Sequence, residues 1–321
     1  MPAWAELPDA ATLLADFGLT PDEIAKVRAG EFVRYAVQPA SERELVAGLA
    51  FQVSVPPGEL VKRSMEDLLD RVDPNVIAYG VVAANGSSAD FARLSLQPNV
   101  GARARAYVNA APGGELNLSA EEITAFRKLG SGAAPSVVES HVRSALIARL
   151  SAYRAQGLAG VASYARSGDE RRSPADELRV ASSGAKKLEK YAPAAYRLLL
   201  SYPDAKPPGM EETFRWSHFD ADGTPTLVLT HLMLVPDGKA WIAMERQFYV
   251  STGYNAEQAV AAFLPSESGT VVVYTNRTST DQIAGIGGRA KRSIGSKVLA
   301  SQLEAMFERA RAASLPRGGV R

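Results

Sequence analysis

The alternation of apolar and polar positions is strongest in the C-terminal third of the chain, where it predicts a run of strands. A period of two places successive side chains on opposite faces of a sheet, and short turns such as Pro236-Asp237-Gly238 favour antiparallel hairpins. A glycine-rich hinge at Ala284–Gly288 then leads into a long amphipathic helix that runs to about Ala312. The four predicted strands are Thr226–Val235, Lys239–Ser251, Val260–Leu264 and Thr270–Arg277.

The first hundred residues combine the same strand pattern with two helical segments. A capping box with proline at its first helical position, Thr20–Glu23, predicts a short N-terminal helix. A proline pair ends the strand Val46–Val55, and apolar residues at helical spacing then predict a helix over Gly58–Asp70. The other strands predicted in this part are Glu31–Val37, Val76–Val82 and the weaker Phe91–Leu96.

The middle of the chain, from Ser119 to about Tyr202, is predicted to be helical. Capping sequences recur there at Ser119, Ser136 and Ser173. Strands that cluster on either side of a helical block indicate an α+β fold rather than an alternating α/β fold. We therefore divide the chain into an N-terminal helical segment (1–30), a first sheet part (31–118), a helical insertion (119–209) and a second sheet part with the C-terminal helix (210–321).

Composition narrows the classes of function without naming one. Hydrophobic residues make up 46% of the 321 residues, and the net charge of +1 argues against a nucleic-acid-binding protein driven by bulk electrostatics. Cysteine is absent, which excludes disulfides and thiolate chemistry. Because the sequence shows neither a run of about 18 apolar residues nor a secretory signal, we expect a soluble protein.

Familiar catalytic and metal-binding motifs are missing from the sequence. The three histidines, His141, His218 and His231, are far apart, and none belongs to a metal-binding pattern. There is no nucleophile elbow and no phosphate-binding loop, so Gly285–Gly288 is better explained as a hinge that frees the final helix. We therefore predict no metal and no cofactor.

Two segments at opposite ends of the chain carry a resemblance to a known superfamily. One is FQVSVPPGELVKRSMEDLLD, where a strand ends at a proline and a helix follows at once; the other is GRAKRSIGSKVLASQLEAMFERA in the terminal helix. Through them the chain resembles the START-like (helix-grip, SRPBCC-type) superfamily. It is also similar to uncharacterised bacterial START-like proteins that carry a helical insertion before a strand such as Phe214–Ser217.

The resemblance implies a START-like helix-grip fold, in which a curved antiparallel sheet holds a long C-terminal helix. It also implies that a lipid-like hydrophobic small molecule is bound or transported in a cavity between the sheet and the helix Gly288–Ala312. Similar bacterial proteins suggest export to the periplasm, whereas the lack of a visible signal keeps the cytoplasm as the alternative.

Polar residues within apolar strand faces are the best candidates for orienting such a ligand. His231 lies among leucines on its strand face, and Arg246 lies between Met244 and Phe248 on the next. The alternative for each is a structural role, such as a buried ion pair between Arg246 and a carboxylate. The predicted ligand-binding set is His231, Met244, Arg246, Phe248, Tyr249, Tyr274, Ile294 and Val298, the last two from the helix stripe expected to pack on the sheet.

The terminal helix begins with cations, which its dipole does not favour. Arg289, Lys291 and Arg292 are therefore candidates for a peripheral membrane contact, with a solvated basic face as the alternative. The leading functional expectation is a non-enzymatic carrier or binding protein. One alternative is a cyclase- or hydrolase-like enzyme that uses His231 as acid or base. Another is a protein-interaction scaffold, which needs an exposed apolar patch on the helical insertion.

Overall fold

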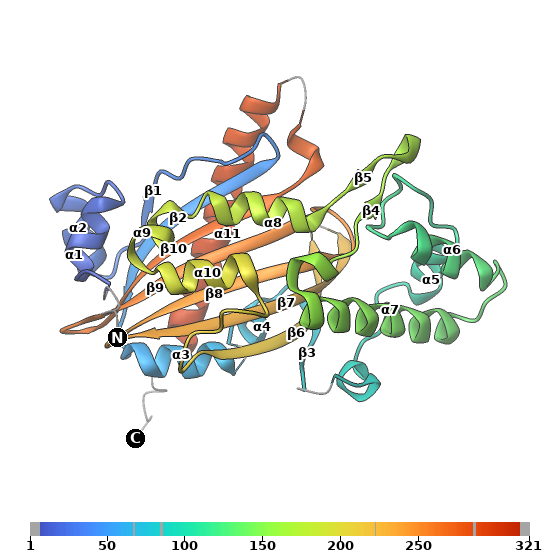
Figure 1. The fold of residues 1–321 in the computed structure, drawn as a ribbon, viewed down its shortest axis with the longest axis horizontal. Coiled ribbons are helices and arrows are strands. Elements are labelled where there is room, and N and C mark those ends of the chain that lie inside the picture. The colour runs from blue at the N-terminus through green and yellow to red at the C-terminus, as the bar shows by residue number, and fades with distance from the viewer. Residues whose placement is uncertain (1–6, 67, 84–85, 222, 285–286, 315–321) are drawn as a thin grey trace.

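One large antiparallel β-sheet organises the protein (Figure 1). The structure, a computed structural model, describes residues 7–66, 68–83, 86–221, 223–284 and 287–314. Within these residues eight strands form a sheet in the order β1-β2-β10-β9-β8-β7-β6-β3, and all neighbours are antiparallel. The sheet and the long C-terminal helix confirm the α+β class and are compatible with a helix-grip arrangement.

The strands come from both ends of the chain, as the sequence predicts. The four predicted C-terminal strands are confirmed, although β9 is longer than its apolar centre indicated. Gly238 has φ of 60° in the turn between β7 and β8, a conformation that suits glycine. The bounds are β1 (Val33–Tyr35), β2 (Glu44–Val53), β3 (Val76–Val82), β6 (Glu211–Ala221), β7 (Thr224–Asp237), β8 (Ala240–Val250), β9 (Ala256–Ser266) and β10 (Gly269–Ser279), with β4 (Tyr164–Ala165) and β5 (Arg171–Arg172) paired separately.

Helices fill the N-terminus, the middle and the C-terminus of the described chain. The predicted capping boxes at Thr20 and Ser119 are both formed, since each hydroxyl accepts from the backbone N–H three residues on. The bounds are α1 (Ala10–Asp16), α2 (Pro21–Arg28), α3 (Pro57–Met65), α4 (Leu68–Val72), α5 (Val100–Val108), α6 (Ala120–Lys128), α7 (Pro135–Gln156), α8 (Pro174–Ser183), α9 (Lys186–Tyr191), α10 (Pro193–Ser201) and α11 (Gly288–Ser314).

Three local predictions are wrong. Phe91–Leu96 is not a strand: a short 3₁₀ helix ends at Phe91, and Phe91, Leu94 and Leu96 are buried in the large core cluster of the insertion face. The helix expected over Gly58–Asp70 divides into α3 and α4. The helix α7 begins at Pro135 with no side-chain cap, so Ser136 is not its N-cap. Helical structure also starts earlier than predicted, with α5.

Helices cover both faces of the sheet (Figure 1). On one side, called the insertion face below, lie α7 to α10 together with α1 and α2; on the other, the α11 face, lie α3, α4 and α11. The main core fills the insertion face, where Leu229 and Met233 belong to one cluster with Leu146 and Leu198. Burial of a side chain of this size contributes roughly 1.5–3 kcal/mol to the stability of the fold. Because sheet and insertion residues are buried against each other, the insertion stabilises the sheet.

The helix α11 packs along β2, near one edge of the sheet. Ala300 and Leu303 are buried against this strand, and the Ser296 hydroxyl accepts a hydrogen bond from a β2 backbone N–H. The prediction that Ile294 and Val298 belong to the packing stripe is wrong, because they are 65% and 51% exposed. At 100° per residue these two positions lie on the side of the helix opposite Ser296 and Ala300.

Candidate ligand site on the sheet

His231 and Arg246, the two polar residues chosen from the sequence, lie opposite each other on the insertion face and are fully buried. The Tyr153 hydroxyl lies 3.0 Å from Nδ1 of His231, and Oε2 of Glu212 lies 3.0 Å from Nε2. An ionised carboxylate can only accept a hydrogen bond. The Nε2–H therefore donates to Glu212, and the Tyr153 hydroxyl donates to Nδ1.

Burial keeps the imidazole of His231 neutral, although its neighbour Glu212 favours the charged form. Burial lowers the pKa of His231 to about 4, an effect that the hydrogen bond with Glu212 only partly offsets. Burial by itself would raise the pKa of Glu212, but hydrogen bonds from His231 and Lys206 outweigh it and hold the pKa at about 2. Because both ring nitrogens are engaged inside the core, the geometry favours a structural role for His231 over an acid–base role.

Arg246 also serves the fold, but not through an ion pair. Its Nε donates to Oε1 of Gln258 at 3.1 Å, and its Nη2 donates to Oγ of Ser182 at 3.1 Å and to the Leu199 carbonyl. Within the described chain no carboxylate forms an ion pair with it, and burial lowers its pKa. Arg246 thereby joins β8 and β9 to α8 and α10.

The other predicted ligand residues are not gathered in one place. A β-bulge between Leu229 and Thr230 shifts the β7–β8 register, so that Tyr249 turns to the same face as Phe248. Strict alternation had placed these two on opposite faces. Met244, Phe248 and Tyr249 belong to the core of the insertion face, Tyr274 lies on the α11 face against Phe307, and Ile294 and Val298 are exposed.

A cluster of polar residues that includes Tyr274 but centres on glutamates not singled out from the sequence lies on the α11 face. Gln247 of β8 is opposite Glu257 of β9, which is opposite Thr278 of β10. Gln247 donates to Oε1 of Glu257 at 3.2 Å, and Thr278 donates to Oε2 at 2.8 Å. The Tyr254 hydroxyl donates to Gln247. We call Glu245, Gln247, Tyr254, Glu257, Tyr274, Asn276 and Thr278 the Glu245 cluster.

Solvent reaches this cluster although it lies over the central strands. Glu245, Gln247, Glu257 and Tyr274 are only half-buried, even at mid-strand positions. The residues beside them on this face are small: Ala259 lies between Glu245 and Asn276 in the register, and Ala47, Ala243 and Ala261 are further alanines of the same face. The polar groups of the cluster are thus bordered by short side chains and are partly exposed.

The Glu245 carboxyl has a strongly perturbed acidity. The pKa of Glu245 is raised to about 7, chiefly by burial; the charge of Arg215 lowers it, Glu257 and Asp70 raise it, and the hydrogen bond with Gln247 lowers it. Burial also raises the pKa of Glu257, and it raises the pKa of Tyr254 and of Tyr274 well above the ordinary value. Partly exposed titratable groups with shifted pKa values are typical of functional sites.

Arg215 and Asp70 border the cluster on its β6 side. Arg215 is buried, its Nη2 donates to the Ser64 carbonyl of α3, and its Nη1 lies 3.9 Å from Oδ2 of Asp70 in α4. The Ser217 hydroxyl donates to Asp70 at 2.7 Å. Around Glu245 there are thus three carboxyls (Glu245, Glu257 and Asp70) and one guanidinium, which favours a ligand group that is cationic or rich in hydrogen-bond donors.

Little in the sequence could have shown this cluster. The only local signal is the pair Glu245 and Gln247, two polar residues on one face of an otherwise apolar strand. Their partners Glu257 and Thr278 join them only through the register of three strands.

The other predicted features have simple positions. Arg289 and Lys291 are exposed, whereas Arg292 donates to the Ser41 carbonyl at 3.4 Å. On the insertion helices, the large apolar side chains found exposed among the described residues are Val137 of α7 and Leu200 of α10. Among the same residues, no group of three His, Asp or Glu gathers as metal ligands would, and no helix is long and apolar enough to cross a membrane.

Comparison with known proteins adds no relative to this picture. The sequence matches no known family in a scan of protein families, and a search of curated proteins found no match.

Proposed function

We propose that the chain is a START-like, helix-grip binding protein for an amphipathic small molecule held on the α11 face. The observation that carries the proposal is Glu245, a half-buried carboxyl whose pKa is about 7, on the sheet face that α11 covers. Such a group lowers the stability of the folded protein, because an ionised carboxylate in a poorly solvated place costs free energy unless it is paired.

The α11 face offers two environments to one ligand. Around Phe51, Leu234 and Val272 it is apolar, and Met65 and Phe307 at its border are partly exposed. Around Glu245 it is polar and carries more carboxyls than cations. A molecule with an apolar body and a cationic or donor-rich head fits both parts. Burial of the body would supply affinity at roughly 25 cal/mol per Å² before ordering costs.

Three dodecyl compounds with the same chain and different heads test the proposal: dodecylamine, dodecanol and dodecanoate. Each is titrated by calorimetry below its micelle-forming concentration at pH 8, where Glu245 is ionised. We expect dodecylamine to bind most tightly, and Glu245→Gln to weaken it about tenfold, the effect of one charge-assisted hydrogen bond. The matched control is Glu308→Gln, an exposed carboxylate on α11. No saturable binding of any of the three, or equal binding by both variants, would falsify the proposal.

A second candidate function on the same site is acid–base catalysis. A carboxyl whose pKa is near 7 can take or give a proton at neutral pH, and Arg215 stands close enough to act on its charge. Glu245 is then the general base. This candidate predicts a turnover whose rate rises with pH through about 7 and is lost in Glu245→Gln, whereas a carrier releases its ligand chemically unchanged.

A further inference from the structure

A pocket of about 260 Å³ opens on the insertion side of the sheet, apart from the Glu245 cluster. It lies where the chain before β2, the strand β5 and the first turns of α8 meet the ends of β9 and β10. Arginines are the most frequent charged residues of its wall: Arg43, Arg171, Arg172 and Arg277 all line it. Neither ligand site considered above includes any of them.

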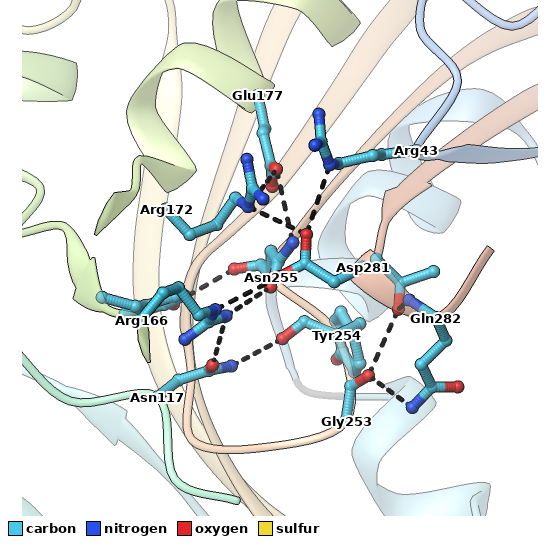
Figure 2. A network of polar contacts seen from close by, with 12 residues as sticks. Arg43, Asn117, Arg166, Arg172, Glu177, Gly253, Tyr254, Asn255, Asp281 and Gln282 are labelled. Atoms are coloured by element: carbon cyan, nitrogen blue, oxygen red, sulfur yellow. Dashed lines mark hydrogen bonds and ion pairs between the residues drawn. The ribbon is translucent and has the colours of Figure 1, made fainter. Parts of the chain in front are cut away.

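A single carboxylate, Asp281, is shared by three guanidiniums beside this pocket (Figure 2). Its Oδ1 lies 3.3 Å from Nε of Arg43 and 2.8 Å from Nε of Arg172, and its Oδ2 lies 3.2 Å from Nε of Arg166. Arg166 is further held by Asn117 and Asn255. In Figure 2 the terminal nitrogens of Arg43 and Arg172 point away from Asp281, which leaves two guanidinium ends to face the same side.

The carboxylates that line the pocket are already engaged. Glu44 pairs with Arg277 at 2.7 Å, and Asp176 pairs with Arg179 at 2.6 Å. Glu177 pairs with Nε of Arg172 at 3.6 Å and accepts a hydrogen bond from Asn255 at 3.3 Å, and burial raises its pKa. The pocket and its immediate partners hold six guanidiniums (Arg43, Arg166, Arg171, Arg172, Arg179 and Arg277) and four carboxylates (Glu44, Asp176, Glu177 and Asp281).

The local backbone adds to this positive potential. Ser173, the N-cap of the ten-residue helix α8, lines the pocket, so the positive end of the helix dipole lies at its wall. The exposed Arg171 stands two residues before this cap. The excess of guanidiniums, their preset orientation and the helix end all favour an anion over a neutral or cationic group.

We propose that this pocket binds a small molecule through an oxyanion group, a phosphate or a carboxylate, held between Arg43, Arg171 and Arg172. Asp281 pairs with Nε of Arg43 and of Arg172 and leaves the terminal nitrogens of both to contact the anion. The volume admits a molecule larger than the anion alone. The site is independent of the ligand proposed for the α11 face, because the two lie on opposite sides of the sheet.

Calorimetric titration with inorganic phosphate, phenyl phosphate and succinate at constant ionic strength tests the site. We expect at least one of the three to bind with a stoichiometry of one, and Arg43→Gln/Arg171→Gln to weaken it at least about tenfold. The control Arg28→Gln, an exposed arginine of α2, should leave the affinity within about twofold. Arg171 is exposed and the Arg43 side chain is 42% exposed, and a matching thermal unfolding curve would verify that the variant folds.

Glu177→Gln provides a change of opposite sign. It removes negative charge from the pocket wall while keeping an acceptor for Asn255, so phosphate should bind more tightly than in the unmodified protein. A phosphatidylglycerol vesicle is the fourth probe, and binding to it without binding of any small oxyanion overturns the proposal. The proposal is equally overturned if no oxyanion binds saturably, or if the double variant and Arg28→Gln lose affinity alike.

Discussion

Neighbouring residues of β8 face opposite sides of the sheet, and the burial and hydrogen bonding of their charged groups differ between the two sides. Arg246 is fully buried against the insertion, where Gln258, Ser182 and the Leu199 carbonyl accept its hydrogen bonds. Glu245, one position away, is half-buried and its pKa is raised to about 7. One face therefore uses its polar groups to fix packing. The α11 face holds a carboxyl where ionisation is unfavourable, and a bound cationic or donor-rich group would stabilise its ionised form.

The largest expected effect is on the insertion face. Tyr153→Ala removes a fully buried ring that stacks on Phe248 at 4.0 Å, and should lower the free energy of unfolding by about 3–5 kcal/mol. Tyr153→Phe keeps the ring and loses the hydrogen bond to His231, so it should cost about 1–2 kcal/mol. Urea denaturation measures both. A loss below about 1 kcal/mol for Tyr153→Ala would show that this face is not a structural core.

The second effect has the opposite sign and lies on the α11 face. The pKa of Glu245 in the folded protein, about 7, is above its ordinary 4.5, so the folded state binds a proton more strongly and loses stability as pH rises between these values. Glu245→Gln should therefore stabilise the protein by about 1–3 kcal/mol at pH 8 and by little at pH 4. Thermal unfolding at the two pH values checks this, with Glu308→Gln as the control. Equal stability of Glu245→Gln and the unmodified protein at pH 8 contradicts the prediction.

The third prediction concerns His231 on the insertion face, whose effect on stability has the opposite pH dependence to that of Glu245. Burial lowers the pKa of His231 to about 4, so the unfolded chain takes up a proton at pH values where the folded protein does not. Stability should fall by about 1–2 kcal/mol for this residue as pH drops from 6.5 towards 4. Burial likewise lowers the pKa of His218 to about 4. His231→Gln should therefore remove roughly half of the loss of unfolding free energy that the two histidines cause as pH falls. An unchanged slope of unfolding free energy against pH in His231→Gln would contradict the buried, neutral imidazole.

The smallest effect concerns the outer side of α11. Ile294→Ser/Val298→Ser should change stability by no more than about 0.5 kcal/mol, because both side chains are exposed. Leu303→Ala on the inner side should cost about 2–4 kcal/mol. Denaturation of both variants compares them directly. A large loss in the double serine variant would place these residues in a contact that the structure does not contain.

Local patterns predicted most of the strands and several helix starts, because both depend on short-range chemistry. Alternation in β7 and β8 and the capping box at Thr20 are determined by residues that are near one another in sequence. The wrong strand at Phe91–Leu96 shows the limit of that argument. Its large apolar residues suggested a strand, but they pack against helices that lie elsewhere in the sequence.

The candidate site depended on long-range geometry and was mostly missed. The bulge beside Thr230 moved Tyr249 to the other face, and no local residue pattern announces it. Tyr274 was predicted and does belong to the Glu245 cluster, whereas Glu257 and Thr278 join it only once β8, β9 and β10 are aligned. His231 and Arg246 were predicted to orient a ligand; both are buried, and their partners on α7, α8 and α10 favour a structural role.

The titration of the Glu245 carboxyl tests the central claim most directly. Carbon-13 NMR of the glutamate side-chain carboxyls, with Glu245→Gln for assignment, measures its pKa in the free protein and with dodecylamine. We predict a pKa near 7 for the free protein, and a lower pKa with the amine because a bound cation favours the ionised form. A pKa between about 4 and 5 that dodecylamine does not change would contradict the assignment of the α11 face as the ligand site.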